Sequence, residues 1–346
     1  MKKGNRYGTH RVIEPKGVLP QPADKIDNNM DEIYDNEILI DVQTLNIDSA
    51  SFTDISKRAD GDKEKIAGIM LDIVEKQGKH RNPWTGSGGM LLGTVEQIGD
   101  ALKGKTDLKE GDKIATLVSL SLTPLRIDKI KEIRHETDQV DIDGKAILFE
   151  SGIYAKIPDD MPQNLALAAL DVAGAPAQTA KLVKSGDTVV IIGAGGKSGM
   201  LCCYEAKKRA GVTGKVIGIT HSERSTSRLK SLGFCDEVFP ANATQPIPVL
   251  EKIEKLTNGK LADVTINNVN IPDTEMTSIL ITKDDGIVYF FSMATSFTKA
   301  ALGAEGVGKD VNMLIGNGYT KGHAEITLQE LRESDKLRKI FTELYA

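Results

Sequence analysis

A glycine-rich turn in the second half of the chain has the composition of a phosphate-binding loop. It follows the apolar run 189–192, and a helical pattern begins directly after it. The glycines allow a sharp turn and a close approach of the backbone to a pyrophosphate, and the N-terminus of the next helix favours an anion. The residues expected to contact a dinucleotide there are Gly193, Gly195, Gly196, Lys197, Ser198 and Gly199.

The same loop carries part of another phosphate-binding pattern. Gly196, Lys197 and Ser198 match the end of a P-loop, in which lysine reaches the terminal phosphates. The P-loop also needs a glycine five positions before Gly196, and Ile191 stands there. The loop therefore predicts a dinucleotide site, with Lys197 either beside the pyrophosphate or solvated.

The residues after the next expected strand, 215–220, bear on the choice of cofactor. An NAD-selective fold usually presents a carboxylate to the ribose at this point. Here the chain reads His221, Ser222, Glu223 and Arg224, so the strand end itself carries none. Ser222 and Arg224 are suited to a 2′-phosphate, which favours NADP. NAD stays open, because Glu223 could turn toward the ribose while Arg224 remains solvated.

Strands and helices alternate around this loop, which is typical of a doubly wound parallel sheet. A helix is expected over 225–232, ending at Gly233, and further strands over 263–267 and 286–292. Strand 286–292 would suit an edge at which two copies pair into a homodimer or higher homo-oligomer. Ligands bind beyond the carboxyl ends of such strands. The residues expected near the nicotinamide for this reason are Asn267, Asn268, Ser292 and Met293.

The region before the loop is rich in short strands instead. Residues 37–46 alternate apolar and polar side chains, residues 89–99 read as a strand pair or bend, and residues 111–118 as a turn and strand. One helix interrupts them and ends before Gly78. A helical linker is expected near 164–180, and a closing helix from about Thr327, with Glu330 completing a capping box.

Composition and charge narrow the class of protein. The 346 residues suit two domains, and a net charge of −5 without a basic block argues against nucleic acid or an anionic membrane as a partner. The N-terminus shows no apolar signal region, which predicts a cytoplasmic protein. The three cysteines, Cys202, Cys203 and Cys235, are expected to be small apolar fillers.

This arrangement resembles the medium-chain dehydrogenase/reductase superfamily over nearly the whole chain. The markers are strand 37–46, the pair 93–99 and 111–115, and the loop 193–199. The resemblance implies an α/β fold with a Rossmann nucleotide-binding domain over 161–316. It also implies a β-rich, GroES-like substrate domain formed by 1–160 and 317–346.

The chain departs from the zinc-dependent branch of that superfamily. The segments that carry the zinc ligands in that branch correspond to residues 46–51 and 86–92 of this chain. Neither segment contains a cysteine or a histidine. The five histidines show no paired metal-ligand spacing. The resemblance therefore implies a chain without a metal, in which hydride transfer proceeds without a Lewis acid.

Two longer strings, 10–23 and 316–331, resemble the L-erythro-3,5-diaminohexanoate dehydrogenases of anaerobic lysine fermentation. That resemblance implies oxidative deamination of a small diamino acid to 5-amino-3-oxohexanoate, with hydride transfer to NAD(P)⁺ and release of ammonia. Such chemistry needs a base for the reacting amine and a cation for the substrate carboxylate.

Location alone selects the candidates for these roles. Asp48, just beyond strand 37–46, is the first choice for the base and Asp171, on the linker, is the second; Arg11 or Lys16 could hold the carboxylate. An acidic residue at such a position is also often a turn or helix-cap residue. Trp84 could either wall the substrate pocket or anchor the core.

Two other functions fit the same features. Zinc-free relatives in the superfamily include NADPH-dependent quinone and enoyl reductases, which need no carboxylate for a cationic substrate. A binding or scaffold protein that has lost catalysis would also keep this fold, since one fold hosts many functions.

Overall fold

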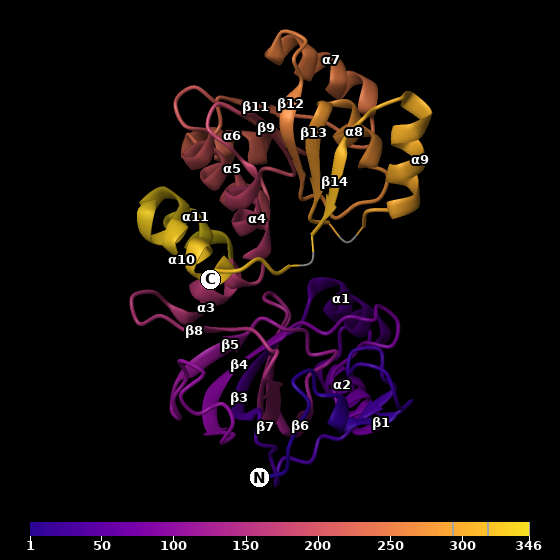
Figure 1. The fold of residues 1–346 in the computed structure, drawn as a ribbon, viewed down its shortest axis with the longest axis vertical. Helices are drawn as coiled ribbons and strands as arrows, with labels where there is room; N and C mark the ends of the chain where they lie inside the picture. Colours follow the sequence, from indigo (N-terminus) through magenta and orange to yellow (C-terminus); the bar gives the residue numbers. More distant parts are fainter. Residues whose placement is uncertain (293, 317, 346) are drawn as a thin grey trace. The chain divides into compact units, whose positions relative to one another are not determined.

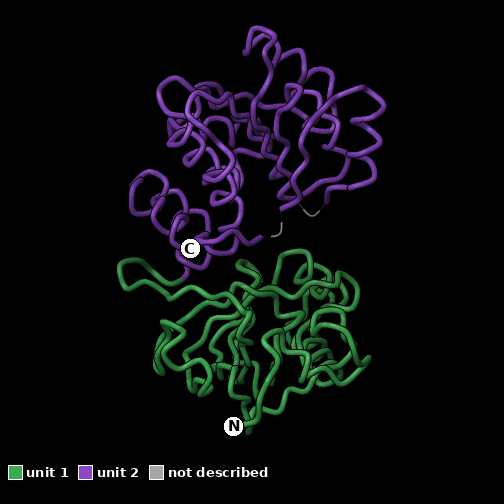
Figure 2. The backbone as a smooth tube through the Cα atoms, viewed as in Figure 1, with its two compact units in different colours: residues 1–163 green, residues 164–346 purple. Residues whose placement is uncertain are grey.

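The computed structural model describes residues 1–292, 294–316 and 318–345, and the chain divides into two compact units, Met1–Gln163 and Asn164–Ala346 (Figure 2). The prediction for Met293 therefore lies outside the described residues. No helix within these ranges is long and apolar enough to cross a membrane.

The first unit is built on a six-stranded antiparallel sheet in the order β6-β7-β3-β4-β5-β8, with a short hairpin of β1 and β2 before it (Figure 1). The elements are η1 (Thr9–Arg11), β1 (Val12–Glu14), β2 (Lys25–Ile26), β3 (Glu37–Asn46), α1 (Ser49–Arg58), α2 (Lys63–Gln77), β4 (Met90–Ile98), β5 (Lys113–Thr116), β6 (Leu125–Arg134), β7 (Gln139–Phe149) and β8 (Tyr154–Lys156).

Of the strands of this unit, the sequence patterns predicted β3, β4 and β5, whereas β1, β2, β6, β7 and β8 were not predicted. Strand β3 has the predicted bounds, and α2 ends at Gly78 in the left-handed conformation, as expected. Residues 89–99, expected as a strand pair or bend, instead form the single strand β4. A Cβ on Gly93 would lie 2.4 Å from the carbonyl oxygen of Asp41, so this glycine permits the close approach of β3 and does not mark a turn.

The second unit holds a six-stranded parallel sheet in the order β11-β10-β9-β12-β13-β14 (Figure 1). This is the Rossmann order 3-2-1-4-5-6, in which the strand order reverses at the β9–β12 boundary. The elements from the linker onward are α3 (Gln163–Leu170), α4 (Gly174–Leu182), β9 (Thr188–Ile192), α5 (Lys197–Ala210), β10 (Lys215–Thr220), α6 (Glu223–Leu232), β11 (Glu237–Pro240), α7 (Pro246–Thr257), β12 (Ala262–Asn267), α8 (Glu275–Leu280), β13 (Thr282–Phe290), α9 (Phe297–Val307), β14 (Asn312–Ile315), α10 (His323–Glu333) and α11 (Asp335–Tyr345).

The strand predicted as an edge lies inside this sheet. Strand β13 pairs with β12 on one side and with β14 on the other. The prediction was wrong because the short segment Asn312–Ile315, which forms the outer strand β14, gave too weak a strand signal to be recognised.

The C-terminal helices belong to the second unit in this structure, whereas the sequence placed 317–346 with the first. Helix α10 packs against α4 and α5, and α11 packs against α5. The predicted capping box at Thr327 and Glu330 is wrong, because α10 begins earlier, at His323 after Gly322. Thr327 lies inside the helix, where its hydroxyl donates to the carbonyl of Ala173 at 3.3 Å.

The interface between α10 and α5 contains a buried carboxyl group. Glu330 is 1% exposed, and neither of its carboxyl oxygens has a hydrogen-bond partner among the described residues. Burial raises the pKa of Glu330 well above its ordinary value, and Glu205 and Glu333 raise it further, while Lys208 and Arg209 oppose them. The folded chain therefore holds the Glu330 proton up to a higher pH than the unfolded chain does.

This proton makes stability depend on pH. Between the unfolded pKa of a glutamate and the raised folded pKa, only the unfolded chain releases the proton, so stability falls by up to about 1.4 kcal/mol per pH unit. We expect Glu330→Gln to remove this loss and to gain stability over the wild type as pH rises from about 5 to 8. Urea unfolding at both pH values measures it, with the exposed Glu325→Gln on the same helix as control. An advantage of E330Q that is equal at the two pH values would contradict the assignment.

Candidate functional site

The glycine-rich turn between β9 and α5 is held against the next strand by its own backbone. The amides of Gly193 and Ala194 both donate to the carbonyl of Ile219, at 3.0 and 2.9 Å, and the amide of Gly196 donates to that of Gly193. Gly193 has a φ of 79°, in the left-handed region that glycine adopts at little cost. The turn is thus rigid and lies at the carboxyl end of the sheet.

The other glycines of this turn have distinct roles. A Cβ on Gly199 would lie 2.2 Å from the carbonyl oxygen of Gly193, so this position allows the helix to pack on the turn. A Cβ on Gly195 would lie 2.7 Å from the side chain of Ser225. At Gly196 the nearest atom would be 3.4 Å away, which leaves the backbone open at the start of α5. These are the roles that a dinucleotide loop requires.

The N-terminus of α5 has the features of an anion site. Its N-cap is Gly196, and no side chain caps the helix. A pyrophosphate would satisfy the uncapped N–H groups and meet the positive end of the helix dipole. Helices α3 and α4 are separate around residues 171–173, where one continuous linker helix was expected, and Asp171 lies in this break. Asp171 forms an ion pair of 2.9 Å with Lys197.

The end of β10 exposes the residues predicted to choose the cofactor. Ser222 is the N-cap of α6, where it forms a reciprocal capping box with Ser225. Its hydroxyl is therefore already engaged, which sequence alone did not show. His221, Glu223 and Arg224 are exposed, and the strand end carries no carboxylate of its own.

Two of the side chains predicted to approach the nicotinamide after β12 and β13, Asn267 and Ser292, instead form hydrogen bonds within the protein. Asn267 is fully buried: its Nδ2 donates to Thr274 and Ser278, at 2.8 and 3.0 Å, and its Oδ1 accepts from Val269. It is therefore a structural residue, and its predicted approach to the nicotinamide was wrong. Asn268 has buried amide atoms without a hydrogen-bond partner among the described residues. The Ser292 hydroxyl accepts the amide of Ala294 at 3.1 Å.

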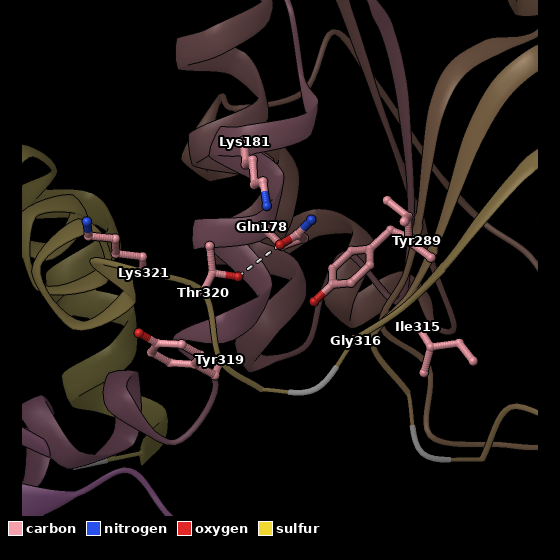
Figure 3. A pocket seen from close by; sticks show the side chains of 9 residues that line it. Gln178, Lys181, Tyr289, Ile315, Gly316, Tyr319, Thr320 and Lys321 are labelled. Carbon is pink, nitrogen blue, oxygen red and sulfur yellow. Dashed lines mark hydrogen bonds between the residues drawn. The ribbon is translucent and has the colours of Figure 1, made fainter. Parts of the chain in front are cut away.

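A pocket of about 310 Å³ lies beside the carboxyl ends of β13 and β14 (Figure 3). Gln178 and Lys181 of α4 form one wall, and Tyr289 of β13 forms another. The remaining lining residues come from the end of β14 and the segment after it: Leu314, Ile315, Gly316, Tyr319, Thr320 and Lys321.

In the first unit, Asp48 follows β3 and begins α1. Its Oδ1 accepts the amide of Ser51 at 3.0 Å, which makes it the helix cap that was considered as an alternative. Its Oδ2 is shielded from solvent and has no hydrogen-bond partner among the described residues. A buried carboxylate oxygen without a partner is rare and needs an explanation, of which a catalytic role is one.

His80 is a neighbour of Asp48 that the sequence did not indicate. It is 0% exposed, and neither ring nitrogen makes a hydrogen bond of good geometry with a described residue. Burial lowers the pKa of His80 to about 4, although the charge of Asp48 opposes the shift. The imidazole is therefore neutral at physiological pH and places no positive charge beside Asp48.

The side-chain amide of Asn82 joins the loop that follows His80 to α1. Asn82 donates to the carbonyl of Ser51 at 3.3 Å and accepts the amide of Trp84 at 2.8 Å. Trp84 itself is 51% exposed, with the Arg58 guanidinium stacked 3.5 Å above its ring. Trp84 is therefore not a core anchor; it lines a surface groove with α1 and α2.

Arg11 was predicted to hold a substrate carboxylate, and the structure contradicts this. The side chain is 1% exposed, and all five of its N–H donors are used. The acceptors are both oxygens of Glu37, at 2.9 and 2.7 Å, Asp27 at 3.2 Å, and the carbonyls of Asn29 and Glu32 at 2.7 and 3.0 Å. Arg11 therefore holds the N-terminal segment, and the alternative, Lys16, donates to the nearby carbonyl of Val12.

Within the described residues, no three histidine, cysteine or acidic side chains are grouped so as to hold a metal ion. Cys202 and Cys203 are buried and Cys235 is partly buried, all as free thiols, and burial raises the pKa of Cys202 to about 12.

A Rossmann sheet with an uncapped glycine-rich loop, preceded by a β-rich unit, defines an oxidoreductase of the medium-chain dehydrogenase/reductase superfamily. Residues 10–158 match the family described as L-erythro-3,5-diaminohexanoate dehydrogenase N-terminal domain, and residues 198–317 match the family described as zinc-binding dehydrogenase.

Two relatives named L-erythro-3,5-diaminohexanoate dehydrogenase match this chain over nearly its whole length. One, from Acetoanaerobium sticklandii, is 66% identical over 343 residues, which are 99% of each chain. The other, from Fusobacterium nucleatum subsp. nucleatum, is 64% identical over 345 residues, which are 100% of each chain. The chain belongs to the L-erythro-3,5-diaminohexanoate dehydrogenase family.

Solved structures share the fold at much lower identity. A quinone oxidoreductase of Pseudomonas syringae pv. Tomato DC3000 gives a TM-score of 0.53 at 20% identity, covering 94% of this chain and 86% of that one. A mycobacterial protein complexed with NADPH gives a TM-score of 0.54 at 15% identity, with coverage of 92% and 84%. These similarities support the fold only.

Proposed function

We propose that the protein catalyses oxidative deamination of L-erythro-3,5-diaminohexanoate. The observation that carries this proposal is the full-length identity of 66% and 64% with two relatives of that name. In the proposed reaction, the bond between C3 and its hydrogen breaks, and the hydride passes to NAD(P)⁺. The resulting imine takes up water, and 5-amino-3-oxohexanoate, ammonia, NAD(P)H and a proton are formed.

The residues of the second unit fit a nicotinamide dinucleotide. The open backbone at Gly196 and the uncapped amides of α5 would hold the pyrophosphate, and the bound cofactor would supply the hydride acceptor. Lys197, fixed by Asp171 at 2.9 Å, adds a positive charge at the start of the helix.

Asp48 is our candidate for the base that deprotonates the C3 ammonium. Its Oδ1 is fixed by the amide of Ser51, so the carboxylate is held in one orientation and Oδ2 stays available for a proton. The neutral His80 beside it supplies no positive charge that would repel an ammonium group. Asp171, the other candidate, is already paired with Lys197.

We propose NADP⁺ as the preferred acceptor, with NAD⁺ as an alternative substrate. Support comes from the exposed Arg224 in the first turn of α6, just after β10, where a 2′-phosphate would lie. Arg224→Glu is expected to raise the KM for NADP⁺ at least about tenfold, because an attraction to phosphate becomes a repulsion, while the KM for NAD⁺ changes little. Steady-state kinetics with both cofactors measures this, and Lys230→Glu, exposed on the same helix, is the control. Equal changes for both cofactors would argue against a 2′-phosphate contact.

The function is tested by incubating the protein with L-erythro-3,5-diaminohexanoate and NADP⁺ or NAD⁺, while following nicotinamide absorbance and ammonia together. One ammonia per reduced nicotinamide supports deamination. Reduced nicotinamide without ammonia contradicts it, as does a protein that is inactive with the diamine yet oxidises NADPH with quinones or enones. The latter result would indicate the reductase function that is known among distant structural relatives.

A further inference from the structure

We infer that the pocket between α4 and the ends of β13 and β14 binds a small carboxylate. The inference deepens the proposed function, since the proposed substrate carries such a group. It starts from the residues that line the pocket, which include Lys181 and Lys321 and, among the described residues, no aspartate or glutamate. In Figure 3 the Lys321 ammonium group points away from the other lining side chains, so Lys181 is the cation that the inference uses. A pocket with this charge is suited to an anion and repels an ammonium group.

The hydrogen bond between Thr320 and Gln178 determines which end of the Gln178 amide is free to meet a ligand. The Thr320 hydroxyl donates to Oε1 of Gln178 at 2.9 Å, and Figure 3 shows this bond on the side facing the segment after β14. The amide oxygen is thereby occupied, and the Nε2 group, with its two N–H donors, is left for the pocket. Lys181 lies one turn further along α4, and its chain runs toward Gln178 (Figure 3).

The opposite wall adds a hydroxyl donor. Tyr289 is 2% exposed and lines the pocket, and its hydroxyl lies close beneath Gly316, where an added Cβ would be 2.8 Å from it. Burial raises the pKa of Tyr289, so the phenol keeps its proton and donates. In Figure 3 this hydroxyl is turned toward α4.

These groups define the ligand by chemistry. An ammonium, an amide N–H and a phenol O–H are available from two walls, and a carboxylate accepts all three. Lys181 forms no ion pair with any described residue, so its charge is not already compensated. The pocket volume of about 310 Å³ admits a short acid but not a second dinucleotide.

The test is equilibrium binding of sodium propionate to the protein in the absence of diamine, by calorimetry or by ligand-observed NMR. Propionamide, which has the same shape without the charge, is the matched probe. We expect propionate to bind and propionamide to bind at least about tenfold more weakly. Lys181→Met and Gln178→Glu should each weaken propionate by a similar factor. Q178E keeps the acceptor for Thr320 and replaces the donor with a negative charge.

Lys184→Met is the control, because this exposed lysine follows the same helix and does not line the pocket. Equal binding of the two probes, or propionate binding that is unchanged in K181M and Q178E, overturns the inference. Because no turnover is required, a failed deaminase assay would leave the binding result intact.

Kinetics then distinguishes the two sources of the carboxylate. If the substrate's own carboxylate occupies the pocket, propionate competes with the diamine, and K181M raises the KM for diamine about tenfold while the KM for NADP⁺ is unchanged. If a separate acid occupies the pocket, propionate changes the rate without competing with the diamine. K181M then abolishes this response to propionate and leaves the KM for diamine unchanged. Either pattern supports a carboxylate site.

Discussion

Gly199→Ala is expected to destabilise the second unit and to abolish cofactor binding together. The added methyl would lie 2.2 Å from the carbonyl oxygen of Gly193 and 2.7 Å from the Cα of Ala194, both backbone atoms of the loop. Neither atom can rotate away, so the helix must move off the turn. Overpacking of this kind costs about 3 kcal/mol. Thermal unfolding and the KM for NADP⁺ measure the two effects.

Two other glycines separate the steric cause from a general effect of added methyl groups. Gly306→Ala on α9, where an added Cβ would have no neighbour within 4 Å, should leave stability unchanged or raise it by up to about 1 kcal/mol. Gly196→Ala should keep the fold, since its Cβ would meet nothing closer than 3.4 Å, yet weaken the cofactor by blocking the approach of the pyrophosphate. A G199A protein that melts and binds NADP⁺ like the wild type would contradict this description of the loop.

Asp48→Asn is expected to lower kcat by about 10²- to 10⁴-fold while the fold survives. The asparagine oxygen can still accept the amide of Ser51, and asparagine is as good an N-cap as aspartate. What it loses is the ability to accept the proton from the substrate ammonium. The effect should therefore appear in kcat, with the Tm and the KM for NADP⁺ close to the wild-type values.

The matched control is Asp62→Asn at the start of α2. Asp62 caps that helix in the same way, since its Oδ1 accepts the amide of Lys65 at 3.0 Å. We expect D62N to keep full activity, which separates the loss of a proton acceptor from a change at a helix cap. A D48N enzyme with a wild-type kcat would leave Asp48 as a helix cap only.

Local patterns were enough to predict the parts of the fold that depend on neighbouring residues. Strand β10 has the predicted bounds, and Gly233 ends α6 in the left-handed conformation, as its position indicated. The loop at Gly193–Gly199 was also predicted, because its function depends on glycines that are adjacent in sequence. The alternation of strand and helix also predicted a parallel sheet, but it did not predict the strand order or the outer strand β14.

Features that depend on distant contacts could not be read in this way. Arg11 was taken as a free cation because its partner Glu37 is 26 residues away and the acceptors at 29 and 32 are backbone carbonyls. The buried His80, and the pocket formed by Gln178 and Tyr289, also arise from packing between elements far apart in the chain. Glu330 matched a capping pattern, yet its side chain is buried against α5.

The central claim, that hydride leaves C3 of a diamino acid, is tested most directly with L-erythro-3,5-diaminohexanoate deuterated at C3. We predict that the deuterium appears in the reduced nicotinamide, that one ammonia is released for each, and that turnover slows if hydride transfer limits the rate. Reduced nicotinamide without deuterium, or deuterium transfer without ammonia, would contradict the account.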